Sequence, residues 1–367
     1  MMARLGDICE ILDSKRIPIT ASNRKAGIYP YYGANGIQDY VDDYIFDDEL
    51  VLLAEDGGHF GSTDKPIAYR VSGKCWVNNH AHVLKPKAIL DVDYLCYSLM
   101  FRDVSNVVNG ATRQKLTQAD MREIEIPLHP LGEQLAIVEK LNKIFALVSL
   151  RKQQLSKLDE LVKSRFIEMF GDPMTNNNGY TLKKYGDLFE LNAGGTPSKQ
   201  KSEYWDNGTI SWIGSNMCQN TVIYENDGNY ITEEGLKHSS ARMFPVDTVL
   251  IALVGATIGK TALLKFKTTT NQNVLGVRGI KESGYTPEFI FYYTQGLYPK
   301  FLNIGDGGFA MASKGFISEL PVPVVDLPLQ EQFAAFLKQT DKSKFEIQKS
   351  LEKLETLKKA LMQKYFG

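Results

Sequence analysis

The chain has 367 residues, of which 43% are hydrophobic and 23% are charged, and its formal net charge is -1. This length predicts two or three domains, and the near-neutral charge argues against a protein that holds nucleic acid through a large excess of basic residues. No apolar run reaches the roughly 18 residues that a membrane-spanning helix needs. The amino-terminal residues include acid too early for a signal peptide, so we expect a cytoplasmic protein.

The cysteines stand far apart in the sequence, and none belongs to a Cys-x-x-Cys pair. This spacing is typical of reduced thiols and predicts neither a zinc site nor another metal centre. The four residues are Cys9, Cys75, Cys96 and Cys218.

The sequence contains an internal repeat. The stretch 157–171 returns at 353–367, and Pro-Leu-x-Glu-Gln occurs at both 130–134 and 328–332. A repeat on this scale predicts two similar globular regions, each followed by a long helix. We therefore expect an α+β protein with an internal two-fold repeat, divided into a first globular domain (1–129), a first long helix (130–171), a linker (172–180), a second globular domain (181–327) and a second long helix (328–367).

The first globular region is predicted to mix strands and helices. Apolar, β-branched runs at 44–53, 67–71 and 81–84 are typical of strands, and 92–101 has a helical pattern. His80 and His82 have the residue type of metal ligands, but no carboxylate or third histidine stands near them in the sequence, and apolar residues continue the run. We interpret this pair as part of a strand edge.

Polar, aromatic and basic side chains gather in the predicted loops of this region. Arg and Lys can pair with guanine or phosphate, and Asn and Gln can read adenine. Ordinary solvated loops explain any single one of them equally simply, but similar sets occur in both halves, which favours binding. The candidate DNA contacts here are Tyr32, Asn35, His59, Lys65, Asn79, Arg113, Gln114 and Lys115.

Residues 130–171 are predicted to form one long helix. Its apolar residues alternate at spacings of three and four, which is typical of a coiled-coil seam. Gly171 suits a left-handed carboxyl-terminal cap, and 176–179 reads as the following loop. The seam residues are Ile137, Leu141, Ile144, Val148, Leu155, Leu158 and Val162.

The second globular region is predicted to have strands at 248–254, 261–266 and 274–277 and a helix at 287–298. The stretch 255–261 imitates a phosphate-binding loop, but three residues rather than four separate its glycines, so we expect a tight turn between strands. The candidate DNA contacts of this half are Thr196, Ser198, Lys199, Lys201, Trp212, Ser215, Asn216 and Lys314.

The second long helix repeats the seam spacing. A long helix with one apolar stripe needs a partner, and we expect the two helices of the chain to pair as an antiparallel coiled coil. Packing of each helix on its own globular region, or on another chain, remains open. The seam residues of the second helix are Ile347, Leu351, Leu354 and Leu361.

Taken in order, these features resemble the DNA specificity subunits of type I restriction-modification systems. The resemblance covers nearly the whole chain and depends on the duplicated arrangement more than on any single motif. The motifs that carry it are Gly110 to Thr117, Gly194 to Ser198, Trp212-Ile213, Gly259 to Ala262 and Asn271 to Asn273.

The resemblance implies that each half is a target recognition domain that reads one half of a split DNA sequence. The helices would set the spacer and dock two methyltransferase subunits and the restriction subunits, which would use S-adenosylmethionine, ATP and Mg. This chain would itself be non-catalytic and need no cofactor. The stretch 305–311 differs from 110–114, so the two half-sites are expected to differ.

Two other classes of function remain. The chain could be a scaffold that binds proteins and never touches bases. It could also be a nuclease or methylase with an unrecognised site, although the sequence has neither the Asn/Asp-Pro-Pro-Tyr of amino-methyltransferases nor a Gly-x-Ser-x-Gly elbow.

Overall fold

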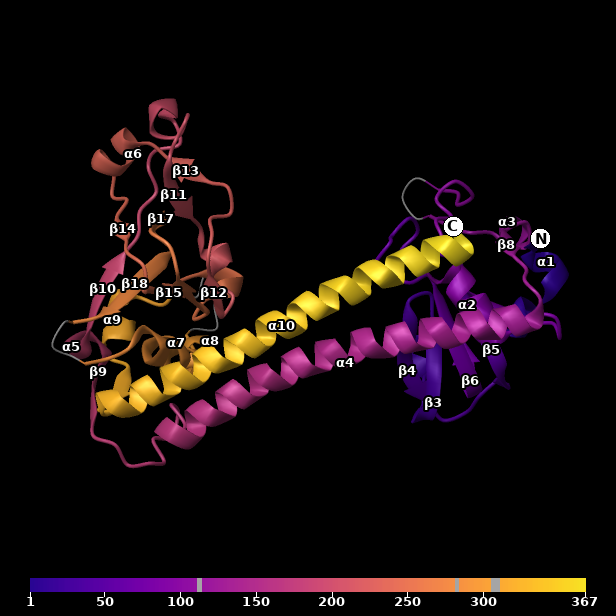
Figure 1. Cartoon of the computed structure of the whole chain (residues 1–367), viewed down its shortest axis with the longest axis horizontal. Helices are drawn as coiled ribbons and strands as arrows, with labels where there is room; N and C mark the ends of the chain where they lie inside the picture. Colours follow the sequence, from indigo (N-terminus) through magenta and orange to yellow (C-terminus); the bar gives the residue numbers. More distant parts are fainter. Residues whose placement is uncertain (111–113, 281–283, 305–310) are drawn as a thin grey trace. The chain divides into compact units, whose positions relative to one another are not determined.

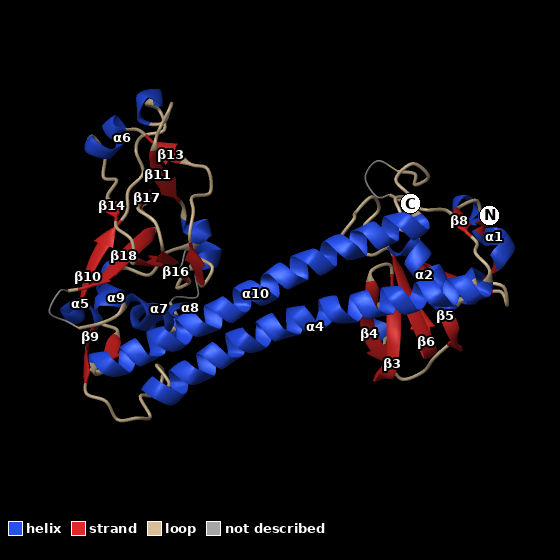
Figure 2. Cartoon of the chain, in the orientation of Figure 1, coloured by secondary structure: helices blue, strands red, loops and turns tan. Residues whose placement is uncertain are grey.

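The computed structural model describes residues 1–110, 114–280, 284–304 and 311–367 (Figure 1). The chain forms two compact units: unit 1 comprises Met1–Gln153 and Gln348–Gly367, and unit 2 comprises Gln154–Ile347. Each unit has a mixed α/β globular region, as predicted, together with part of each of two long helices, α4 (Leu131–Phe170) and α10 (Leu327–Phe366) (Figure 2). The predicted domain limits lie at the ends of the long helices, whereas the compact units divide both helices near their middles.

The globular region of unit 1 is built on a six-stranded sheet. Only the β3–β6 pair is parallel among the strand pairs of this sheet, and α2 (Val92–Met100) packs against β5, β6 and β7. The sheet order is β2 (Cys9–Ile11), β7 (Ala81–Pro86), β5 (Phe46–Ala54), β6 (Ala68–Val77), β3 (Ala26–Gly33) and β4 (Gly36–Val41). Smaller elements are β1 (Met2–Arg4), α1 (Leu5–Ile8), η1 (Asp13–Lys15), η2 (Ala21–Asn23), α3 (Gln118–Arg122) and β8 (Glu125–Pro127).

The globular region of unit 2 repeats this frame in two sheets. The first has the order β10 (Phe189–Ala193), β18 (Val274–Gly279), β15 (Val249–Ala252), β16 (Thr261–Leu264) and β12 (Thr221–Ile223), and the second has the order β13 (Tyr230–Ile231), β11 (Ile210–Ile213), β17 (Thr268–Thr270) and β14 (Met243–Phe244). The predicted turn at 255–261 is confirmed, because η5 (Gly255–Thr257) lies between the antiparallel strands β15 and β16. Smaller elements are β9 (Leu182–Lys184), α5 (Tyr185–Leu188), η3 (Ser202–Tyr204), η4 (Ser215–Met217), α6 (Glu233–Lys237), α7 (Pro287–Gly296), α8 (Tyr298–Leu302), α9 (Lys314–Ser318) and β19 (Pro321–Pro323).

A buried glutamine fastens the first turn of each long helix to its globular region. Gln134 Nε2 donates to the Ile89 and His129 carbonyls at 2.9 and 2.8 Å, and its Oε1 accepts the Asp91 N–H at 2.8 Å. Gln330 makes the same three bonds in unit 2: Nε2 donates to the Gly284 and Val325 carbonyls, and Oε1 accepts the Thr286 N–H. Asp91 and Thr286 are the N-caps of α2 and α7, so each glutamine ties two helix starts together.

These bonds correct the alignment of the repeat. The two Pro-Leu-x-Glu-Gln stretches would pair Gln134 with Gln332, which is exposed. The structure instead pairs Gln134 with Gln330, which is fully buried. The difference in residue number between Gln134 and Gln330 is the same as the difference between 157–171 and 353–367. Relative to this alignment, the second Pro-Leu-x-Glu-Gln is displaced by two residues.

Within each unit, the long helices lie side by side and run in opposite directions, as predicted. In unit 1, Lys152 Nζ lies 2.8 Å from Glu355 Oε1, and in unit 2, Lys344 Nζ lies 2.5 Å from Asp159 Oδ1. Among the seam residues, Val148, Val162 and Leu351 are buried, and a second group is half-buried: Ile144, Leu155, Leu158, Ile347, Leu354 and Leu361.

The helices also pack on the globular regions. Ile137 and Leu141, predicted to belong to the helix pair, lie in the core of unit 1. Val162 lies in the core of unit 2 with Phe166 and Phe333. The seam and the packing on each globular region are therefore parts of one apolar surface.

Local features agree with the sequence. Gly171 has φ +80° and ends α4 as the predicted left-handed cap, and the loop after it turns at Asn176 and Gly179, which also have positive φ. All four cysteines are free and buried, and burial raises the pKa of the Cys9 thiol to about 12. In the described part of the chain, no helix combines the length and apolarity needed to cross a membrane.

Candidate nucleic-acid interface

Hydrogen bonds join the loops that carry most of the candidate contacts of unit 1. The Asn35 side-chain amide donates to the Gly57 carbonyl at 3.0 Å, and the Gly57 N–H donates to the Gln114 carbonyl at 3.4 Å. The Asn78 N–H donates to the Tyr32 carbonyl at 3.0 Å. These loops (33–36, 55–58, 78–80, 109–110 and 114–117) are called loop cluster 1, and they bring together Tyr32, Asn35, Asn79, Gln114 and Lys115.

The remaining candidates of this half stand apart from these bonds. Half-buried His59 and exposed Lys65 belong to the longer loop between β5 and β6, where the Ser62 hydroxyl accepts the Lys65 N–H at 3.0 Å. Arg113 lies outside the described residues.

The candidate contacts of unit 2 gather around two tryptophans. Trp212 Nε1 donates to the Gly195 carbonyl at 3.2 Å, and Trp205 Nε1 donates to the Ser198 carbonyl at 3.1 Å. The two indole rings meet edge to face with centroids 5.3 Å apart. The Thr196 hydroxyl donates to Gln272 Oε1. Loops 194–201, 214–217 and 271–273 are called loop cluster 2, and their side chains include Ser198, Lys199, Lys201, Ser215 and Asn216.

The two clusters occupy equivalent places in the repeated frame. In each unit a parallel strand pair leads into the loops: Tyr32 is opposite Val77, and Ile213 is opposite Thr270. The residue after the second strand then folds a turn with its own side chain, because Asn78 Oδ1 accepts the His80 N–H at 2.8 Å and Asn271 Oδ1 accepts the Asn273 N–H at 3.0 Å.

This match makes two predicted residues counterparts. Counting three residues on from Tyr32 and from Ile213 gives Asn35 and Asn216, which are both exposed. The neighbouring positions differ, since Asn79 of unit 1 corresponds to Gln272 of unit 2. A common frame therefore presents two different polar surfaces.

Lys314 begins α9, and Ser313 is its N-cap. It lines a hollow of about 780 Å³ together with Asn192 of β10 and Arg278 of β18. Its counterpart in unit 1 is Gln118, which follows the N-cap Thr117 of α3. Glu190 also lines this hollow, and its described lining includes no residue of loop cluster 2.

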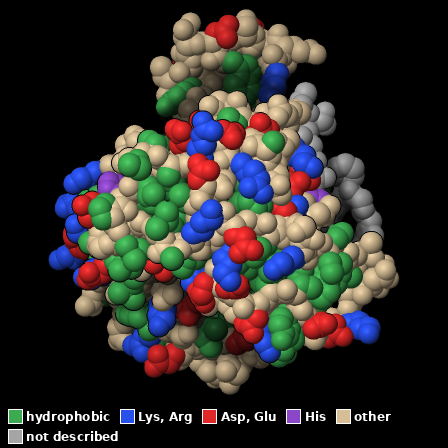
Figure 3. All heavy atoms as spheres, turned by 90° about the vertical axis from the view of Figure 1, so that its right-hand side faces the viewer, with side chains coloured by type: hydrophobic (Ala, Val, Ile, Leu, Met, Phe, Trp, Pro, Cys, Tyr) green, Lys and Arg blue, Asp and Glu red, His purple; other side chains and the backbone are tan. Residues whose placement is uncertain are grey.

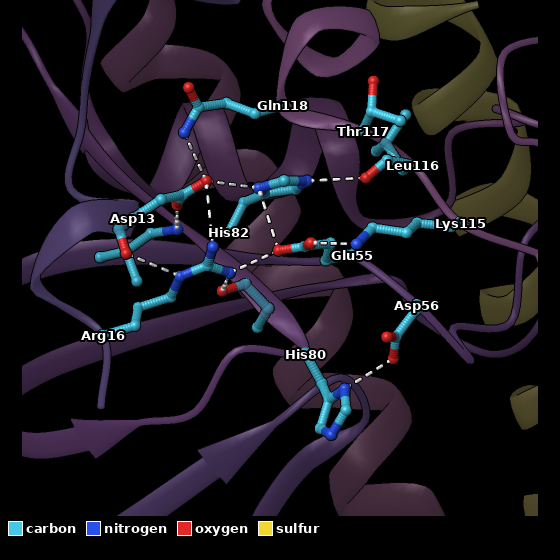
Figure 4. Close-up of polar contacts among 12 residues, drawn as sticks. Asp13, Arg16, Glu55, Asp56, His80, His82, Lys115, Leu116, Thr117 and Gln118 are labelled. Carbon is cyan, nitrogen blue, oxygen red and sulfur yellow. Dashed lines mark hydrogen bonds and ion pairs between the residues drawn. The ribbon is translucent and has the colours of Figure 1, made fainter. Parts of the chain in front are cut away.

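A buried polar network lies beneath loop cluster 1 (Figure 4). His82 Nδ1 lies 2.7 Å from Asp13 Oδ2, and His82 Nε2 lies 2.9 Å from the Leu116 carbonyl oxygen. Asp13 also accepts the Val83 N–H and the Gln118 side-chain amide, each at 2.9 Å. Both ring nitrogens of His82 face acceptors, so the ring binds both partners when each nitrogen carries a hydrogen.

Glu55 extends the network toward the surface. Arg16 Nη1 lies 2.6 Å from Glu55 Oε2 and donates to the Ala81 carbonyl at 2.7 Å. Lys115 Nζ lies 3.0 Å from Glu55 Oε1, and the Lys115 side chain is 52% exposed. Glu55 therefore joins a half-buried guanidinium to an exposed ammonium.

The electrostatics of both carboxyls favour their charged forms. Burial alone would raise the pKa of Asp13, but the hydrogen bond and charge of His82 and the bond from Gln118 outweigh it, and the net pKa is lowered. Burial acts in the same way on Glu55, and the bonds from Arg16 and Lys115 again lower its pKa overall.

Asp13, Glu55 and His82 also have the residue types of a metal site, with candidate ligand atoms within 4.8 Å of one another. Arg16, Gln118 and Lys115 already bind the carboxylate oxygens, and the Arg16 guanidinium lies between the two carboxyls. The positive charge of this guanidinium would repel a divalent cation placed beside it. The donor set therefore fits an ion-pair network better than a cation site.

The prediction that His80 and His82 belong to a strand edge is wrong for His82. Its strand, β7, lies inside the sheet between β2 and β5, and His82 is fully buried. The sequence concealed the network because its acidic residues and its histidine stand far apart: Asp13 is 42 residues from Glu55 and 69 residues from His82. The one local signal was a histidine inside an apolar strand, which needs buried partners.

The described surface carries no obvious basic stripe on the face of unit 1 in Figure 3, where lysines and arginines alternate with acidic residues. This distribution agrees with the net charge of -1. Side-chain geometry in the loops, rather than bulk positive charge, is the feature suited to nucleic acid here.

Two copies of one α/β frame, each ending in different polar loops, define a duplicated protein with one candidate interface in each unit. The family model described as type I restriction modification DNA specificity domain matches residues 1–160 and 177–359. The chain belongs to this family. Its members are specificity subunits, which are non-catalytic and leave the enzymatic activities to partner subunits.

Relatives and solved structures agree with this assignment. A protein of Haemophilus influenzae assigned as a type I restriction enzyme specificity subunit is 30% identical over 270 residues, which cover 63% of this chain and 70% of that protein. The specificity subunit of the Escherichia coli enzymes EcoR124I and EcoR124II is 36% identical over 98 residues, covering 26% and 24% of the two chains. The fold resembles the crystal structure of the type I restriction-modification S subunit from M. genitalium, with a TM-score of 0.62, 15% identity and coverage of 100% and 96%.

Proposed function

We propose that the chain selects the DNA target of a type I restriction-modification complex by reading a bipartite, asymmetric sequence. Loop cluster 1 reads one half-site and loop cluster 2 reads the other. The observation that carries the proposal is the pairing of a common frame with different loops, since the equivalent positions 35 and 216 are both Asn while the equivalent positions 79 and 272 are Asn and Gln.

The chemistry of the loops suits base edges. Asn and Gln side chains can bond adenine in a bidentate manner, and Lys can reach guanine. Both units offer exposed members of these types: Asn35, Asn79, Gln114 and Lys115 in unit 1, and Lys199, Lys201, Asn216 and Gln272 in unit 2.

The long helices are proposed to set the spacer between the half-sites and to dock two methyltransferase subunits and the restriction subunits. Both helices carry apolar side chains that the chain itself leaves at least 41% exposed, including Leu147, Leu150, Leu161, Phe345 and Leu357. Exposed apolar residues in such number favour protein partners. S-adenosylmethionine, ATP and Mg would act in those partners.

Selection from randomised DNA tests this function. The full chain, co-purified with a type I methyltransferase subunit, is incubated with a random duplex library, and the bound DNA is sequenced. Enrichment of two unlike half-sites at one fixed spacing is the expected result. A complex that enriches no sequence would favour a protein-binding scaffold, and methylation or cleavage by the isolated chain would contradict a non-catalytic role.

A further inference from the structure

The network of Asp13, Arg16, Glu55 and His82 is special to unit 1, although the strand frame is common to both units. Strand register relates Val51 to Val249 on β5 and β15, and Leu84 to Val277 on β7 and β18. Following these strands gives the unit 2 residues at the positions of Asp13, Glu55 and His82, which are Ala193, Leu253 and Leu275.

The frame therefore folds without these charges. Leu253 and Leu275 lie in the core of unit 2, and the Leu253 carbonyl still accepts the Ala312 N–H at 2.9 Å, as the Glu55 carbonyl accepts the Leu116 N–H at 2.7 Å. Burying ions costs solvation energy that their mutual attraction often only balances, and apolar replacements are frequently neutral or stabilising. The side chains of His82 and Asp13 are only 1% and 4% exposed. The stability of the frame does not explain why this buried polar pair is present.

The network ends on the segment that carries candidate contacts. His82 Nε2 contacts the Leu116 carbonyl oxygen, and the Glu55 carbonyl accepts the Leu116 N–H. The Glu55 carboxylate forms an ion pair with the Lys115 ammonium. The Lys115 main chain exchanges two hydrogen bonds with Asn109, at 2.7 and 2.9 Å, which fix the Lys115 backbone against Asn109.

The corresponding position in unit 2 has a different character. Met311 bridges Val254 there, as Lys115 bridges Asp56, and Met311 is 58% exposed. Unit 2 thus presents an apolar side chain where unit 1 presents a fixed cation.

We propose that Asp13, Arg16, Glu55 and His82 are positioning residues that hold Lys115 in one geometry so that its ammonium reads a guanine edge in the half-site of unit 1. A flexible lysine suffices for a phosphate, which accepts an ammonium from many directions, whereas a base edge in the major groove requires a fixed donor. The buried carboxylate supplies that fixed direction, and Arg16 balances its charge. This inference rests on the proposed function and names one specificity-determining residue within it.

Two variants test the proposal in the full chain bound to its methyltransferase. The first, Asp13→Ala with Arg16→Thr, Glu55→Leu and His82→Leu, removes all four network side chains together, so that none of these charges is left buried without its partner. The second, Lys115→Met, copies unit 2 at an exposed position and leaves the network intact. Lys115→Arg is the conservative control.

Hydrogen exchange and DNA selection give separate readouts. In the network-free variant, the amide of Leu116 is expected to exchange about tenfold faster or more, with little change in the amides of unit 2. Selection from a random library is expected to lose the preference for guanine at one position of one half-site, by about tenfold in relative binding. The other half-site stays unchanged, Lys115→Met gives the same loss, and Lys115→Arg retains the preference.

The opposite results are equally definite. Unchanged exchange at Leu116, or faster exchange with both half-sites read as before, overturns the positioning role. If the network-free variant does not fold, Lys115→Met decides, because a variant that reads both half-sites normally contradicts the proposal. Failure of the unaltered complex to enrich any sequence defeats the proposed function, and then the positioning role in reading falls with it, while the exchange data still report whether the network holds the segment.

Discussion

Two glutamines show how much one side chain can contribute in each unit. Gln134 and Gln330 each make three hydrogen bonds to main-chain groups at the junction of two helix starts. Both are fully buried, so water cannot replace them, and an unpaired buried donor or acceptor is costly.

We expect Gln134→Ala and Gln330→Ala each to lower the free energy of unfolding by about 2–4 kcal/mol, because each leaves three main-chain groups without a partner. Chemical denaturation followed by circular dichroism measures this change. Gln332→Ala is the matched control: this residue is exposed on the same helix, and a loss above about 0.5 kcal/mol there would contradict the corrected alignment.

The pH dependence of stability follows from the two buried carboxyls. Asp13 and Glu55 have lowered pKa values in the folded chain, so their contribution is present above their unfolded pKa values of about 4 and is lost as pH falls through the folded values. The unaltered chain should lose more stability between about pH 5 and pH 3 than the network-free variant does. Equal losses, measured by denaturation across that range, would show that the ion pairs of the network add no stability.

At the scale of elements, the long helices are where sequence and structure agree best. Their seams are visible in the sequence because one side chain in every three or four must face apolar surroundings. The apolar runs also locate β5, β6 and β7 in unit 1 and β15, β16 and β18 in unit 2, but not the remaining strands. The polar network could not be predicted in this way, because it depends on which distant strands become neighbours. No local sequence pattern indicates that Asp13 lies beside His82.

A heptad inserted into both helices tests their proposed role as a spacer. Insertion after Gln153 and after Ile347, where the compact units divide the helices, keeps the seam in register and leaves the contacts inside each unit intact. Seven residues add about 10 Å of helix, so the selected spacer should grow by about three base pairs, at 3.4 Å each. The half-site bases should stay the same, and altered half-sites with an unchanged spacer would refute the role.

At the scale of the whole molecule, the repeat separates what is shared from what differs. The frame, the glutamine bonds and the Asn78 and Asn271 turns occur in both units, whereas the polar network and the tryptophan pair each belong to one. The loop candidates of both units stay predictions, and the expected difference between 305–311 and 110–114 falls largely outside the described residues. The sequence could not show that Asn35 and Asn216 are counterparts, since no common motif surrounds them.

This equivalence leads to a paired test. Asn35→Ala and Asn216→Ala should each weaken the preference at one base of one half-site, by about 1–3 kcal/mol if the amide makes a bidentate bond. Both side chains are exposed, so thermal stability should change little, with a loss of about 1 kcal/mol at most for Asn35→Ala, which also removes the bond to the Gly57 carbonyl. Library selection with the two variants should show losses in different half-sites, and losses in the same half-site would contradict the assignment of one half-site to each unit.

The composition of unit 1 from two distant segments has a consequence for synthesis of the protein. Unit 2 is continuous from Gln154 to Ile347, but unit 1 needs Gln348–Gly367 as well as its first segment. Tyr94 in the core of unit 1 contacts the ring of Phe366, with centroids 5.2 Å apart. As domains fold while they leave the ribosome, the region made first must wait longest for its last partners, and unit 2 can reach its native packing before unit 1 does.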